Sequence, residues 1–185
     1  DTKEVLHNVN LRLEKGRKLA LVGPSGGGKT TLCHLLPNFY KLDKGDGTIM
    51  IDGQDIRDLT LESVRRNIGI VQQDVFLFVG TIRDNILYGR PDATEEEMFE
   101  AARRANIHDY IMSQPKGYDM ELTEDGANIS QGQRQLLNIA RAALSKAPIL
   151  VLDEATSSVD TRTERHIERG MDRLMKNRTT FVIAH

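Results

Sequence analysis

The sequence predicts an α/β domain in which helices cover a mainly parallel sheet. Its 185 residues, of which 39% are hydrophobic and 28% charged, suffice for one core with a modest insertion and exclude a disordered chain. Unbroken apolar runs, the pattern of strands buried on both faces, occupy residues 19–22, 68–71, 149–152 and 181–184. Each run leads into glycine, amide, acidic or histidine residues. Because open α/β sheets bind ligands beyond the carboxyl ends of their strands, we expect these residues to meet at one sheet edge.

A glycine-rich loop follows the first predicted strand and fits G-x-x-x-x-G-K-[ST], the phosphate-binding loop. Its residues are Gly23, Pro24, Ser25, Gly26, Gly27, Gly28, Lys29 and Thr30. Glycines let the backbone curl so that its N–H groups point at phosphate oxygens, and a helix beginning near Lys29 adds its positive end. We expect Lys29 to reach the β- and γ-phosphates and Thr30 to ligate Mg²⁺. A flexible glycine turn is the alternative, but the position between a strand and an apolar helix argues against it.

Two further regions predict layers beside this core. Asp52 and Gly53 stand between apolar pairs, which is a hairpin signal, and residues 5–13 alternate in polarity. They predict a small antiparallel layer of about residues 1–16 and 46–57. From Gly80 onward the pattern becomes helical, with Thr94 and Glu97 at capping-box spacing. We therefore expect a phosphate-loop core at about 17–79 and 137–185, with a helical insertion at about 80–136.

Two acidic residues, Asp153 and Glu154, end the third predicted strand. Neighbouring strand residues point to opposite sides, so the two carboxylates can take different roles. Asp153 would hold Mg²⁺, as the second acid of phosphate-loop enzymes does. Glu154 would orient and polarise the attacking water. The alternative, a pair of solvated loop acids, is weakened by the phosphate loop elsewhere in the chain.

A short polar segment, Ser130 to Gln133, precedes an amphipathic helix. Ser130 and Gln133 have capping-box spacing. A capped helix start with an adjacent glycine, here Gly132, is also a ready anion site. From the pattern alone, capping is the simpler interpretation.

Taken together, these motifs resemble the nucleotide-binding domain of ATP-binding cassette (ABC) transporters over essentially the whole chain. The residues that stand where that family has its LSGGQ signature are Ile129, Ser130, Gln131, Gly132 and Gln133. Gln73 stands at the Q-loop glutamine, the segment from Ser157 to Asp160 resembles the D-loop, and His185 resembles the switch histidine. Segments 38–40, 80–86 and 130–135 resemble exporters within the family.

The chain departs from the family pattern at a few positions. Ile129 and Gln131 replace the leucine and first glycine of the signature, and Thr123 replaces a usual glycine in the preceding exporter segment. The family's adenine-stacking aromatic lies just upstream of where this chain begins, and family members continue past the switch histidine. The resemblance therefore implies a domain truncated at both ends.

The resemblance implies MgATP hydrolysis that powers export across a membrane, in a head-to-tail dimer that sandwiches two ATP molecules. Glu154, Gln73 and His185 would be the catalytic residues, and Thr30, Gln73 and Asp153 would hold Mg²⁺. The phosphates would lie against residues 23–31, Thr31 included. The signature residues would act on the partner's ATP, and the D-loop residues Ser157 and Asp160 would lie beside them. The implied partners are a second nucleotide-binding domain and a transmembrane domain fused upstream, at the cytoplasmic face of the membrane.

Composition narrows the function classes. Lys and Arg total 25 and Asp and Glu 27, a net charge of −2, so the basic excess of a nucleic-acid binder is lacking. No apolar run approaches the roughly 18 residues of a membrane span. The lone Cys33 can form no internal disulfide and, with no metal-ligand partners at useful spacing, is expected either to pack in the core or to lie at the surface.

Two alternatives remain beside export. The first is a soluble ABC-type ATPase of DNA repair or translation, but residues 74–128 are too few for the coiled coil of repair relatives, and translation relatives carry two cassettes. The second is a regulatory module that binds nucleotide without hydrolysing it. Retention of Glu154, Gln73 and His185 argues against that module.

Overall fold

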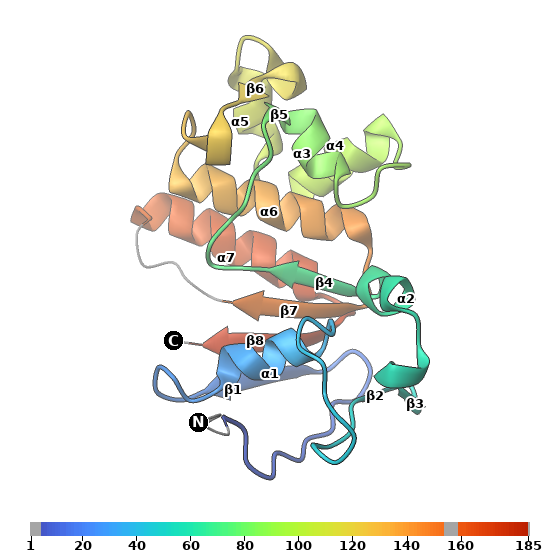
Figure 1. Cartoon of the computed structure of the whole chain (residues 1–185). Coiled ribbons are helices and arrows are strands. Elements are labelled where there is room, and N and C mark those ends of the chain that lie inside the picture. Colours follow the sequence, from blue (N-terminus) through green and yellow to red (C-terminus); the bar gives the residue numbers. More distant parts are fainter. Residues whose placement is uncertain (1–4, 154–158, 185) are drawn as a thin grey trace. The chain divides into compact units, whose positions relative to one another are not determined.

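The computed structural model describes residues 5–153 and 159–184, which divide into two compact units. The first unit comprises the described residues up to Ile70 together with 147–153 and 177–184. The second comprises residues 71–146 and 159–176. Figure 1 traces the chain through both.

A four-stranded sheet in the order β1-β8-β7-β4 forms the first unit's framework (Figure 1). The strands are β1 (Lys18–Val22), β8 (Thr179–Ala184), β7 (Ile149–Asp153) and β4 (Ile68–Val71). β8 pairs in parallel with β1 on one side and β7 on the other. The predicted α/β fold with a parallel sheet is thereby confirmed, and all four apolar runs are strands.

β1 differs from the prediction of strands buried on both faces. Leu19 and Leu21 pack against the core, but Val22 is 79% exposed, and the burial pattern alternates along the strand. The reason is position, since β1 stands at the end of the strand order, where one run of side chains faces the core and the other does not.

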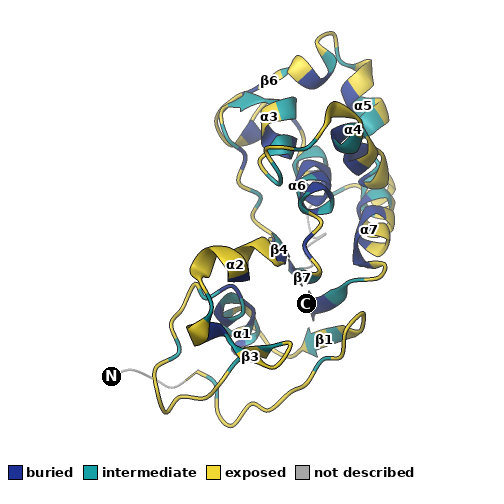
Figure 2. Ribbon diagram, turned by 90° about the vertical axis from the view of Figure 1, so that its right-hand side faces the viewer, coloured by how far each residue is buried: buried dark blue, intermediate teal, exposed yellow. Residues whose placement is uncertain are grey.

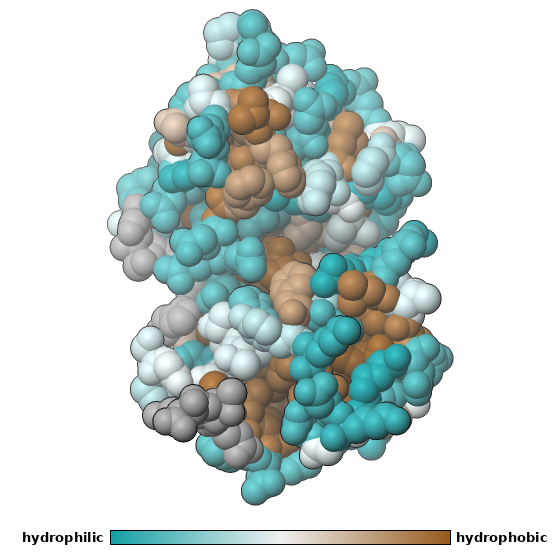
Figure 3. All heavy atoms as spheres, viewed as in Figure 1, coloured by the Kyte–Doolittle hydropathy of each residue, from teal (hydrophilic) through white to brown (hydrophobic). Residues whose placement is uncertain are grey.

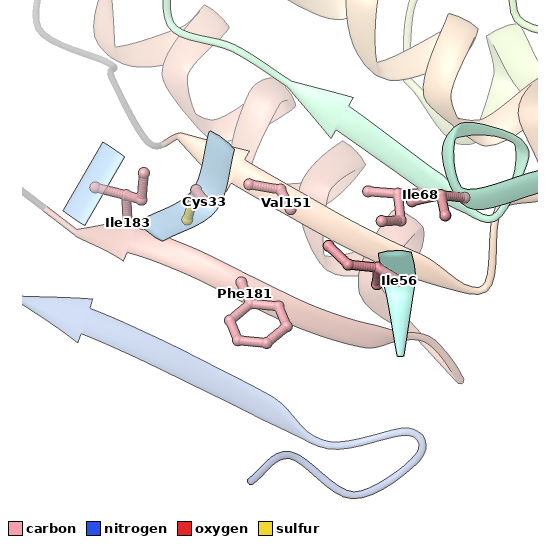
Figure 4. Close-up of a cluster of buried hydrophobic side chains, with 7 residues drawn as sticks. Cys33, Ile56, Ile68, Val151, Phe181 and Ile183 are labelled. Atoms are coloured by element: carbon pink, nitrogen blue, oxygen red, sulfur yellow. The ribbon is translucent and has the colours of Figure 1, made fainter. Parts of the chain in front are cut away.

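The core of the first unit lies on one side of this sheet (Figure 4). Helices α1 (Lys29–Leu35) and α2 (Leu61–Arg66) and the 3₁₀ turn η1 (Ile56–Asp58) contribute to it. Its buried members are Cys33, Ile56, Val64, Ile68, Val151, Phe181 and Ile183. Cys33 is 1% exposed, so of the two expected places, core or surface, it occupies the core.

The Asp52-Gly53 signal marks a hairpin. β2 (Met50–Ile51) and β3 (Gln54–Asp55) pair antiparallel, and both turn residues have positive φ, 50° for Asp52 and 77° for Gly53. Positive φ at both central positions is the geometry for which Asp-Gly is favoured. Residues 5–16 form no strand, because Asn8 (φ 47°) and Gly16 (φ 75°) interrupt the extended backbone and most side chains there are exposed.

Helices build the second unit, with α6 (Gln131–Ser145) at its centre. α6 packs against α3 (Ile82–Leu87), α4 (Glu95–Arg104) and α7 (Thr161–Met175), and Figure 2 shows it largely buried. The unit also contains α5 (His108–Ser113), η2 (Gly117–Asp119) and η3 (Glu124–Gly126). An antiparallel pair, β5 (Gly80–Thr81) with β6 (Glu121–Leu122), was not predicted.

Local helix signals in this unit are confirmed. Thr94 and Glu97 form the expected capping box at the start of α4. Among the described residues, no helix combines the length and apolar content that a bilayer span requires.

Candidate functional site

The phosphate-binding loop connects β1 to α1 at the carboxyl end of the sheet. Gly28 is the N-cap of α1 in the left-handed region (φ 83°), and Gly26 has φ 79°. These conformations are readily adopted only by glycine. Residues 23–27 and Thr30 are exposed, so the loop and the first turn of α1 are open to a ligand.

Lys29 folds back over this loop. Its Nζ donates to the carbonyl oxygens of Gly23 at 2.7 Å and Pro24 at 2.9 Å. The ammonium thus lies within hydrogen-bond distance of the loop backbone, and Thr30 follows Lys29 on the first turn of α1. A cation above inward-curled glycines is the arrangement that a polyphosphate requires.

Asp153 lies at the same edge of the sheet. It pairs in register with Ile183 of β8, next to the Val22–Ala184 pair that leads into Gly23. Burial, and secondarily the nearby Asp153 charge, raise the pKa of the Cys33 thiol to about 12. Because Cys33 belongs to α1, the Asp153 carboxylate must lie close to the helix that carries Lys29 and Thr30.

This donor set fits Mg²⁺. Magnesium keeps several waters and takes one or two protein oxygens together with substrate phosphates, rather than a cage of side chains. A hydroxyl (Thr30) and a carboxylate (Asp153) beside a phosphate loop meet that description. No cluster of three or more His, Cys, Asp or Glu side chains suited to a metal occurs in the described part of the chain.

The signature residues lie in the second unit, at the start of α6. Ser130 Oγ accepts from the Gln133 amide (3.2 Å) and Gln133 Oε1 accepts from the Ser130 amide (2.9 Å), which confirms the capping box. Ile129 is buried and Gln131 is exposed. Ser130 and Gln133 also line a hollow of about 610 Å³, together with Arg103, Arg162 and His166.

Gly132 is buried where α6 meets the start of α7. A Cβ on Gly132 would stand 2.2 Å from Cγ2 of Thr163 and 3.1 Å from Cγ1 of Val159. Only glycine therefore allows the two helix starts to approach this closely. The sequence showed the glycine but not its neighbour, because Thr163 is distant in the chain.

Asp160 of the D-loop segment caps α7. Its carboxylate accepts from the backbone amides of Thr163 (3.0 Å) and Arg162 (3.1 Å). Hydrogen bonds from Thr163 and Arg162 hold the pKa of Asp160 below its usual range. Asp160 and Gly132 thus both lie against Thr163, Asp160 through a hydrogen bond and Gly132 through close packing.

Gln73 follows β4 with an exposed side chain. Its carbonyl oxygen accepts from Nε2 of Gln135 at 2.6 Å, so the backbone of the Q-loop is tied to α6. The sequence assigns no separate role to Gln135. The feature that could have identified it is a polar residue placed among the apolar residues of a helix. Glu154, Ser157 and His185 lie outside the described residues.

The sequence matches the ABC transporter family over residues 6–157. It is 51% identical over 185 residues to a putative multidrug export ATP-binding/permease protein of Bacillus subtilis, and 54% identical over the same length to an ATP-dependent lipid A-core flippase of Syntrophus aciditrophicus. The structure resembles that of a bacterial Atm1-family ABC exporter with ATP bound, at a TM-score of 0.90 and 45% identity.

These similarities cover all of the chain but only part of each relative. The matched part is 32% of the Bacillus protein, 30% of the flippase and 32% of the exporter in the solved structure. The chain therefore spans about a third of the length of the relatives it matches.

Proposed function

Because this chain belongs to the ABC transporter family, we propose that it binds and hydrolyses MgATP and that hydrolysis powers export of a substrate across a membrane. The observation that carries the proposal is the exposed glycine loop with Lys29 folded above it and Asp153 close to α1. The soluble and purely regulatory alternatives are not favoured, since the Bacillus relative is named as a putative multidrug export protein and the similar solved structure is that of an ABC exporter.

In the proposed mechanism, Lys29 exchanges its two loop carbonyls for the β- and γ-phosphates, and the backbone N–H groups of residues 23–31, except that of Pro24, which has none, surround the phosphate oxygens. By the family resemblance, Thr30, Asp153 and Gln73 would hold Mg²⁺. When bound there, the metal would neutralise charge that develops on the phosphate oxygens. These residues bind and orient the nucleotide before any bond is broken.

Hydrolysis needs a positioned water. We assign Glu154 as the general base that takes its proton, with Gln73 orienting the water and His185 contacting the γ-phosphate, on the strength of the family resemblance. A second nucleotide-binding domain would supply its signature residues Ser130, Gly132 and Gln133 to this ATP, and its D-loop would lie alongside. A helix start such as that of α6 is suited to a polyphosphate, because its free amides and dipole favour negative charge.

A transmembrane domain is the proposed second partner, at the cytoplasmic face of the membrane. Phe76, Val79 and Tyr88 are each more than half exposed in the second unit, and Figure 3 shows apolar residues along the segment that leads from β4 to β5. Exposed apolar and aromatic side chains of this kind are typical of a surface that contacts another protein. Retention of the intact gene product in carbonate-washed membranes would support this partner, whereas release to the soluble fraction would restrict the proposal to ATP hydrolysis.

The nucleotide site is tested by Lys29→Ala. Loss of a charged hydrogen-bond donor should weaken ATP binding by roughly 10- to 100-fold, measured by calorimetry. Lys44→Ala, which changes an exposed lysine of the same unit outside the loop, is the matched control and should bind like the parent protein. Equal affinity in both variants would refute the phosphate-binding role.

The catalytic assignment is tested by Glu154→Gln, which keeps the shape of the side chain and removes its basicity. ATP binding should persist while turnover falls by roughly 10²–10⁴-fold, the usual contribution of a positioned base. Turnover near that of the parent protein would show that Glu154 is not the base.

A further inference from the structure

Helix α6 carries a buried amide one turn beyond the signature residues. Gln135 is 5% exposed, and its Nε2 donates to the carbonyl oxygen of Gln73 at 2.6 Å. Residues 73 and 135 are far apart in sequence, so this hydrogen bond ties the loop after β4 to α6. If the loop moved away, the buried Nε2 of Gln135 would lose its acceptor, which costs free energy. The hydrogen bond therefore favours one position of the loop.

A second set of contacts holds the continuation of the same loop on the same helix. Arg141 donates through Nη1 to the Phe76 carbonyl (3.1 Å), through Nε to the Asn85 carbonyl (2.9 Å) and through Nη2 to Asn85 Oδ1 (3.1 Å). Asn85, 1% exposed, in turn donates to the carbonyl of Phe78 (2.9 Å). The guanidinium is desolvated, which lowers the pKa of Arg141.

The two sets of contacts differ in what they position. Arg141 and Asn85 hold residues 76–78, which lie between Gln73 and β5. Gln135 alone among these side chains reaches Gln73 itself. Its contact lies on the first two turns of α6, close to Ser130 and Gly132.

We propose that Gln135 is a positioning residue for Gln73, and that through α6 it links the loop acting on the chain's own ATP to the signature acting on the partner's ATP. This inference rests on the proposed function. When Gln135 holds the Gln73 backbone, the exposed Gln73 side chain projects from a fixed point, and a shift of α6 moves both groups together. A buried glutamine that served stability alone would have no such effect on turnover.

The test compares variants of the intact gene product. Gln135→Met keeps the length of the side chain and removes the donor, and Gln135→Glu keeps its shape while placing a carboxylate against the Gln73 carbonyl. Leu144→Ala, which removes a side chain 1% exposed at the far end of α6, is the control for a general loss of stability. Each is measured for melting temperature, ATP KM and kcat.

We expect both Gln135 variants to lower kcat about tenfold, as one lost hydrogen bond of about 1.4 kcal/mol predicts, with ATP KM changed less than threefold. Leu144→Ala should lower the melting temperature at least as much and leave kcat near that of the parent. In a Gln73→Ala background, Gln135→Met should lower kcat no further, because there is no longer a side chain to position.

Hydrogen exchange of the nucleotide-free protein gives a readout that does not depend on activity. Amides at and just after Gln73 should exchange about tenfold faster in Gln135→Met and unchanged in Leu144→Ala. The inference is overturned if kcat of Gln135→Met matches that of Leu144→Ala, or if its effect multiplies with that of Gln73→Ala. Failure of the proposed function looks different, since ATP turnover would then survive Lys29→Ala.

Discussion

Gly132 provides the sharpest test of how the signature segment is built. In Gly132→Ala the new Cβ would meet Cγ2 of Thr163 at 2.2 Å, against about 3.4 Å for ordinary contact, an overlap of 1.2 Å. Overpacking of this kind costs roughly 1–3 kcal/mol. Alanine regains up to about 1 kcal/mol of helix propensity. We therefore expect a net loss of about 1–2 kcal/mol in the free energy of unfolding, measured by urea denaturation.

A second substitution identifies the cause. Thr163→Ser deletes the clashing methyl, keeps the hydroxyl, and by itself should cost less than about 1 kcal/mol. In the double variant Gly132→Ala/Thr163→Ser most of the loss should be recovered, a non-additivity that only contacting residues produce.

The same substitution elsewhere serves as the control. Gly170 lies inside α7, and a Cβ there would meet nothing closer than the Ala105 carbonyl at 3.4 Å. Gly170→Ala should therefore be neutral or stabilising. Equal stability of Gly132→Ala and the parent protein, or strict additivity with Thr163→Ser, would refute the close approach of α6 and α7 as the reason for glycine.

Two further predictions concern titrating groups. Hydrogen bonds from Arg90, Lys146 and the Thr94 amide lower the pKa of Glu97 from 4.5 to about 2, so the stabilisation they give is complete above pH 4.5 and is lost as the pH falls through 2. In Glu97→Gln the melting temperature should depend less on pH between 4.5 and 2 than in the parent protein. The same fall in melting temperature with pH in both proteins would contradict the lowered pKa of Glu97. The buried Cys33 thiol, with its pKa raised to about 12, should resist a maleimide at pH 8 in the folded protein and react only after unfolding. Rapid labelling of the native protein would disprove its burial.

Local signals in the sequence predicted much of this fold. Each apolar run of four residues became a strand, and the Asp52-Gly53 pair became a hairpin turn with positive φ at both positions. Both capping boxes, at Thr94 and at Ser130, formed as their spacing predicts. These features succeed because each depends on residues within one turn or one strand of one another.

Long-range contacts could not be predicted in the same way. The bond from Gln135 to Gln73, the approach of Gly132 to Thr163 and the pairing of β5 with β6 all join distant segments. Nothing in the local pattern of a single sequence marks such pairs. Residues 5–13 are a prediction that was wrong. Their alternating polarity predicts a strand, but a strand also needs a partner to pair with, and the local pattern does not show whether there is one.

The two interpretations of residues 130–133, as a helix cap and as an anion site, are chemically compatible. In the capping box Ser130 Oγ and Gln133 Oε1 are both acceptors of backbone amides. A hydroxyl keeps its own proton while it accepts, and a side-chain amide keeps two N–H donors on the other atom. The cap therefore occupies one acceptor site on each side chain and fixes their rotamers, while their donors are retained for an anion. A capping box at this helix start thus holds two donors in place before a ligand binds. An unstructured polar segment would have to order its donors during binding, at a cost in conformational entropy.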